Sequence, residues 1–105
     1  MEQPNLDYFE KLSSNNLNFM QKLIDVVKFE FPSDLKEYHN FIQENQLKNA
    51  SEAVHKLKNK IGAFGMEKSY VIAQEYEYEL REGNKDLQVE FEAVIDQIKR
   101  FIDQL

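Results

Sequence analysis

The sequence predicts an all-α protein, an antiparallel four-helix bundle with a short additional helix at the N-terminus. Three observations lead to this fold class. The 105 residues include only three glycines and two prolines, and residue types that favour helices dominate. Apolar residues recur at helical spacing along most of the chain. Short connections separate four long amphipathic segments, which can bury their apolar stripes only against each other. We therefore expect residues 1–105 to form a single domain.

The first two helices are predicted over residues 4–13 and 16–44. Apolar residues of the first helix share one side: Leu6, Phe9 and Leu12. The polar run at 13–16 separates the two helices and offers N-cap residues to the second. Pro32 lies within the apolar stripe of the second helix. We expect a kink or a short break there, because proline removes a helical hydrogen bond.

The third helix, predicted over residues 46–63, has the clearest pattern in the chain. Its apolar residues follow a 3-4-3-4-3 spacing: Leu47, Ala50, Val54, Leu57, Ile61 and Phe64. This spacing predicts one buried seam along the helix. Gly62 and Gly65 are expected to end the helix, as glycines often do at a C-cap.

The last two helices are predicted over residues 67–82 and from Asp86 to the end of the chain. Gly83 ends the fourth helix, and Asp86 is a favourable N-cap for the fifth. Residues 75–80 alternate as a strand does, but they lie within a long run that has no turn signal. We therefore predict a helix there as well.

Charge and composition exclude several classes of protein. The net charge is −6, which disfavours nucleic acid and anionic lipid as partners, because both are negatively charged. The chain has no cysteine, so disulfides and thiolate metal sites are excluded. The N-terminus lacks the features of a signal peptide, and the longest apolar run, at 70–73, is too short to cross a bilayer. We expect a soluble, cytoplasmic monomer.

The candidate functional residue is His55. It lies one residue, about 100° around the helix, from the buried seam position Val54, so it should sit at the flank of the seam and face solvent. Lys58 and Asn59 follow three and four residues later on the same face, and Gly62 lies two turns on. An exposed imidazole is largely neutral, hence nucleophilic, at cellular pH. A neighbouring ammonium can stabilise a transferring phosphoryl group, so this arrangement suits phosphoryl exchange.

The charge distribution around His55 differs from that of the whole chain. Residues 45–68 carry a net charge of +3, whereas the remaining residues together carry −9. We therefore expect a basic patch centred on the histidine, which suits an acidic site on a partner. Taken singly, Lys56 and Lys60 are typical of solvated helix charges, and His39 is typical of a surface residue.

The motif around the histidine resembles that of the histidine-containing phosphotransfer (HPt) domain. Residues 55–58 read His-Lys-Leu-Lys, and Gly62 and the pair Phe64-Gly65 follow. The family has His-x-apolar-Lys-Gly, then small residues, then an apolar residue and glycine. A proline-interrupted helix upstream and Tyr76-Glu77 downstream also match, so that the resemblance covers nearly the whole chain. Asn59 stands where the family usually has glycine.

The resemblance implies a carrier in a His–Asp phosphorelay. His55 would be phosphorylated, Lys58 would stabilise the phosphoryl group, and Lys56, Asn59 and Gly62 would contact the partner. The partners would be response-regulator receiver domains, among them that of a hybrid histidine kinase, and the receiver would supply Mg²⁺. No cofactor and no metal are expected on this chain. Neither a P-loop nor kinase loops are present in the sequence, so we expect no independent enzymatic activity.

Other interpretations stay open. The main alternative is a bundle of the same family that docks a partner without carrying phosphate, and Asn59 is the residue that most favours it. A second alternative is a di-iron site, because Glu52 and His55 form a Glu-x-x-His unit. That site needs a second such unit and inward-facing ligands, whereas the seam places His55 outward.

Overall fold

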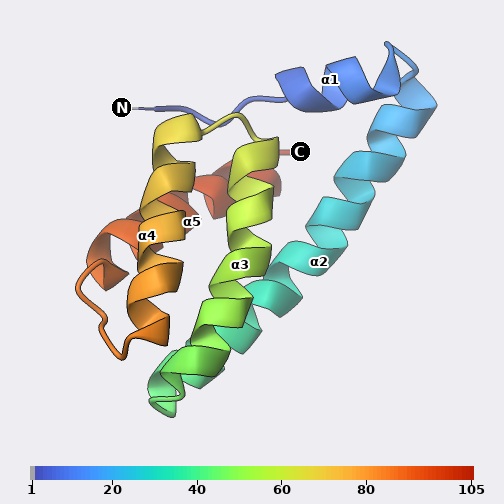
Figure 1. The fold of residues 1–105 in the computed structure, drawn as a ribbon. Helices are drawn as coiled ribbons and strands as arrows, with labels where there is room; N and C mark the ends of the chain where they lie inside the picture. The colour runs from blue at the N-terminus through green and yellow to red at the C-terminus, as the bar shows by residue number, and fades with distance from the viewer. Residues whose placement is uncertain (1) are drawn as a thin grey trace.

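A computed structural model describes residues 2–105 of the protein, and this part of the chain is entirely helical (Figure 1). The five helices are α1 (Asp7–Ser13), α2 (Leu17–Gln43), α3 (Leu47–Ala63), α4 (Glu67–Arg81) and α5 (Gln88–Asp103). In Figure 1, α3 and α4 lie side by side, α2 runs diagonally along the other side of α3, and α5 crosses behind α3 and α4. The predicted class, an all-α bundle with a short extra N-terminal helix, is confirmed.

Helix boundaries agree with the predictions except at three places. The first helix begins at Asp7, later than predicted, and α2 continues through Pro32 without a break. Pro32 is exposed, so water can bind the carbonyl group that the missing N–H leaves free. Asp86 is not the N-cap of α5: the cap is Leu87, and the backbone N–H of Asp86 donates to the Asn84 side chain in the preceding turn.

The end of α3 at Ala63 agrees with the prediction, but only one of the two glycines terminates the helix. The helix runs past Gly62 to Ala63, and Phe64 is its C-cap. Gly65 follows with a φ of 76°, in the left-handed region that glycine adopts without steric cost. Of the two glycines, only Gly65 therefore serves as a terminator. Asn16 caps α2 as expected, since its side chain accepts from the Phe19 N–H at 3.0 Å.

The core is built around α3, whose inward side chains are completely buried: Ala50, Ala53, Val54, Leu57 and Ile61. Two aromatic clusters close the core at its ends. Tyr38 and Tyr76 pack on Phe91 with ring centroids 5.4 and 5.0 Å away, while Phe64 contacts Phe9 and Phe101 at 5.4 and 5.5 Å. Helices α2, α4 and α5 are thereby fixed around α3, and the outer face of α3 is left uncovered. No helix in residues 2–105 is long and apolar enough to cross a membrane.

The N-terminal segment is tied to the bundle before α1 begins. The Glu2 carboxylate accepts from the backbone N–H groups of Lys68 and Ser69, each at 2.9 Å, and so caps the start of α4. Gln97 on α5 donates to the Glu2 carbonyl at 2.7 Å, and the Asn5 N–H donates to the Phe64 carbonyl at 2.9 Å. Burial alone would raise the pKa of Glu2, but its hydrogen bonds to Lys68 and Ser69, together with the charge of Lys68, outweigh burial and lower that pKa.

The hydrogen bonds of the buried Tyr38 hydroxyl can be tested by substitution. It donates to Glu92 at 2.8 Å and lies 2.7 Å from the Tyr76 hydroxyl, which must therefore donate to it. Tyr38→Phe removes both bonds and leaves the buried Tyr76 hydroxyl without a partner. We expect a loss of about 2 kcal/mol in the free energy of unfolding, measured by urea denaturation. Tyr76→Phe is the matched control: because Tyr38 still donates to Glu92, it should cost clearly less. Equal losses would contradict this hydrogen-bond assignment.

Candidate functional site

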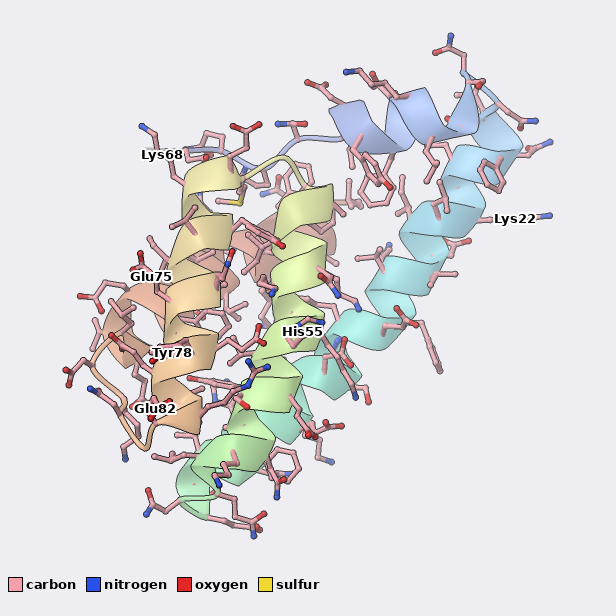
Figure 2. The ribbon with its side chains drawn as sticks, in the orientation of Figure 1. Lys22, His55, Lys68, Glu75, Tyr78 and Glu82 are labelled. Atoms are coloured by element: carbon pink, nitrogen blue, oxygen red, sulfur yellow. The ribbon has the colours of Figure 1, made fainter. Side chains whose placement is uncertain are left out.

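His55 lies midway along α3, on the outer face that the other helices leave uncovered (Figure 2). Its side chain is 52% exposed, whereas its neighbour Val54 is completely buried. The expectation that His55 sits at the flank of the seam and faces solvent is therefore confirmed. His39, on α2, is exposed as expected.

A buried carboxylate orients the imidazole ring. Nδ1 of His55 lies 3.2 Å from both carboxylate oxygens of Glu77, which comes from α4. The Glu77 side chain is only 6% exposed. A carboxylate has acceptors but no donor, so the hydrogen bond requires the ring proton to be on Nδ1. The lone pair of the neutral imidazole is then on Nε2, the nitrogen free to react.

Two cations hold the same carboxylate. Nζ of Lys58 lies 3.0 Å from Oε1 of Glu77, and the Arg81 guanidinium donates to Oε2 from one turn farther along α4. Burial alone would raise the pKa of Glu77, but the hydrogen bonds and charges of Lys58 and His55 outweigh it and lower that pKa. Glu77 is therefore ionised at neutral pH and acts only as an acceptor.

The structure brings Lys58 and His55 together through Glu77. Lys58 is on the His55 side of α3, as its spacing predicts, but its side chain is only 10% exposed. Its ammonium lies over the Tyr70 ring, 5.5 Å from the ring centroid. Lys58 is therefore largely buried and paired, unlike a solvated helix lysine. The predicted contact between Lys58 and a phosphoryl group stays a prediction.

Gly62 allows Tyr70 to lie against α3. A Cβ atom added at Gly62 would be 3.1 Å from Cδ2 of the Tyr70 ring, closer than such contacts normally are. The bare backbone of Gly62 thus accommodates the aromatic ring on which the Lys58 ammonium rests. This finding gives Gly62 a packing role within the chain; its role in partner docking stays a prediction.

The predicted basic patch is wrong. Lys60 pairs with Asp34 at 2.9 Å and Glu30 at 3.2 Å, and Lys56 pairs with Glu37 at 3.4 Å. Burial lowers the pKa of Lys60, but its two carboxylate partners outweigh burial and raise that pKa. Sequence reasoning counted only the charges of one segment, whereas α2 and α4 each place carboxylates against α3. The lysines nearest to His55 are consequently neutralised.

Asn59 lies at a shallow polar hollow one turn from His55. The hollow has a volume of about 340 Å³ and its lining comes from α2 and α3: Glu30, Asp34, Lys56, Asn59 and Lys60. Asn59 is exposed, as expected for a residue on the His55 face. Among the described residues, no group of three or more side chains is arranged to hold a metal ion. One of the two ring nitrogens of His55, Nδ1, is hydrogen-bonded to Glu77.

Sequence reasoning missed Tyr70 and Arg81 and gave Glu77 no role. A signal for them is present in the spacing of α4. Tyr70, Glu77 and Arg81 lie seven and four residues apart, which places them on one helical face. Glu77 comes directly after Tyr76, which belongs to the buried face of α4. The Glu77 carboxylate could therefore have been expected to lie at the edge of the core. Its partners on α3, His55 and Lys58, could not be identified without the packing of α4 against α3.

The lowered pKa of Glu77 predicts a pH-dependent contribution to stability. A group whose pKa is lower in the folded state stabilises the fold above its ordinary pKa, and this stabilisation is lost as the pH falls through the lowered value. Glu77→Gln should reduce the free energy of unfolding by about 2 kcal/mol at pH 7, because it leaves Lys58 buried without its carboxylate. Urea titrations should show this difference shrinking toward pH 3. A difference that does not change with pH would contradict the assignment.

Comparison with known proteins gives one match. The family model of the Hpt domain matches residues 22–105, which include His55, Lys58, Glu77 and Arg81. No curated protein and no solved structure gives a significant match. The matched region covers α3, α4 and α5 and most of α2. Because the match spans well over half of the chain, this protein belongs to the Hpt domain family.

Proposed function

We propose that this protein carries a phosphoryl group on His55 and exchanges it with the aspartate of a response-regulator receiver domain. Hpt domains are histidine phosphotransfer modules that interact with receiver domains in phosphorelays, and they are carriers, not kinases. The observation that carries the proposal for this chain is the pair of His55 and Glu77. The imidazole is half exposed, and its Nδ1 is held by a buried, ionised carboxylate.

The hydrogen bond to Glu77 determines which nitrogen reacts. With the proton on Nδ1, the lone pair of Nε2 attacks the phosphorus of the aspartyl phosphate. The new bond joins Nε2 to phosphorus while the bond between phosphorus and the aspartate oxygen breaks, and the electron pair leaves with the aspartate carboxylate. The ring keeps its Nδ1 proton throughout. Reversal of the same step returns the phosphoryl group to an aspartate.

Glu77 also stabilises the phosphorylated state. Phosphorylation at Nε2 with the proton kept on Nδ1 places positive charge on the imidazole ring. The Glu77 carboxylate lies 3.2 Å from Nδ1 and is shielded from water, which strengthens its attraction for that charge. Because the carboxylate is already in position before transfer, little reorganisation accompanies the reaction.

The face around His55 has the features of a docking surface for a receiver. Asn59 and Lys56 border the polar hollow one turn from the histidine. We assign Lys56, Asn59 and Gly62 to the contact with the receiver. The active-site Mg²⁺ would belong to the receiver.

Replacement of His55 tests the proposed function. His55→Gln should abolish transfer of phosphate from phosphorylated receiver domains, yet change the free energy of unfolding by no more than about 0.5 kcal/mol, since the side chain is half exposed. Incorporation of acid-labile phosphate measures the first effect and urea denaturation the second. His39→Gln, at the other exposed histidine, is the matched control and should be labelled as the wild type is. Labelling of His55→Gln would overturn the assignment.

The same assay separates a carrier from a docking module. We expect the wild type to accept phosphate from at least one receiver of a panel. Asn59→Gly leaves the α3 backbone bare one turn from His55, so it should widen the set of receivers that serve as donors. If the wild type stays unlabelled with every receiver while Asn59→Gly is labelled, Asn59 blocks transfer. The natural protein is then a docking module with an unreactive histidine.

A further inference from the structure

Lys58 and Arg81 bind the same carboxylate but differ in their surroundings. Both are held by Glu77, Lys58 at Oε1 and Arg81 at Oε2. Each of these oxygens lies 3.2 Å from Nδ1 of His55, so both cations lie beside the imidazole ring. What distinguishes them is how freely each can turn toward a phosphoryl group on Nε2.

The Lys58 ammonium is enclosed. Its side chain is 10% exposed, with Glu77 on one side and the Tyr70 ring beneath it. Tyr70 is in turn seated against Gly62, where no side chain intervenes. An ammonium is a compact point charge. Lys58 has three N–H donors, but its enclosure between Glu77 and Tyr70 restricts their access to a phosphoryl group on the exposed side of His55.

The Arg81 guanidinium lies at the open edge of the site. Its side chain is 54% exposed, and it donates to Glu77 through Nη2. A guanidinium has five N–H donors in a planar fork. Arg81 can therefore keep one donor on Glu77 and direct others to the oxygens of a phosphoryl group on the adjacent ring. Arginine also matches phosphate geometry through paired hydrogen bonds.

We propose that Arg81 contacts the phosphoryl group on His55, and that Lys58 is a positioning residue that acts through Glu77. This assignment rests on the proposed function and moves stabilisation of the phosphoryl group, which the motif predicts for Lys58, to Arg81. Arg81 stabilises the charge on the phosphoryl oxygens during transfer. Lys58 keeps Glu77 ionised and in place, and thereby fixes the proton on Nδ1.

The test uses phosphoramidate, a small donor that needs no receiver. Nε2 forms a bond to phosphorus while the P–N bond of phosphoramidate breaks and ammonia leaves. The rate of His55 labelling is followed by ³¹P NMR on the full chain, and the imidazole tautomer by ¹⁵N NMR. The variants are Arg81→Ala, Arg81→Lys and Lys58→Met, the last of which preserves the apolar stem. Arg100→Ala, an exposed arginine on α5, is the matched control.

We expect His55 of the Arg81→Ala variant to be phosphorylated at least about tenfold more slowly than in the wild type, with the His55 tautomer unchanged. Arg81→Lys should be intermediate, and Arg100→Ala should match the wild type. Lys58→Met should lower stability and shift the tautomer away from Nδ1–H. Wild-type rates in Arg81→Ala would overturn the inference. So would slow labelling in Lys58→Met with an unchanged tautomer, because Lys58 would then act on the phosphoryl group directly. Absence of His55 labelling in the wild type would instead contradict the proposed function itself.

Discussion

The buried carboxylate of Glu77, between α3 and α4, is the interaction on which the geometry of His55 depends. It accepts from His55, Lys58 and Arg81, so one anion links residues of both helices. Burial of an unpaired carboxylate would be costly, and these partners are what keep it ionised. The same contact fixes the imidazole proton and the relative position of α3 and α4. Stability and reactivity are therefore coupled at this residue.

The surrounding fold serves to hold α3 and α4 in contact. Gly62 lets the Tyr70 ring approach α3, and the ring supports Lys58. At the start of α4, two backbone N–H groups donate to the carboxylate of Glu2, a residue far away in the sequence. Tyr38 and Tyr76 join α2 to α4 beneath the site through their hydroxyl groups. The half-exposed His55 therefore lies on a helix, α3, whose position relative to α4 is restrained by several contacts. Such rigidity suits a residue that must present one nitrogen to a partner.

Helical periodicity was sufficient to predict the fold class, the approximate helix limits and the outward position of His55, because each depends on the pattern within one helix. The failures have a common physical origin. The basic patch was inferred from the charges of one segment, but Lys60 meets carboxylates of α2. Lys58 was placed on the correct face, yet its partner Glu77 comes from another helix. Interactions between helices depend on the rotation and register of one helix against another, and the periodicity within each helix does not reveal these.

The tautomer of His55 tests this account most directly. Long-range ¹H–¹⁵N NMR of the imidazole ring, at a pH where the ring is neutral, distinguishes a proton on Nδ1 from one on Nε2. We expect Nδ1–H in the wild type, and a loss of that preference in Glu77→Gln, whose side-chain amide can donate as well as accept. A wild-type ring protonated mainly on Nε2, or an identical tautomer in both proteins, would contradict the claim that Glu77 prepares Nε2 for phosphoryl transfer.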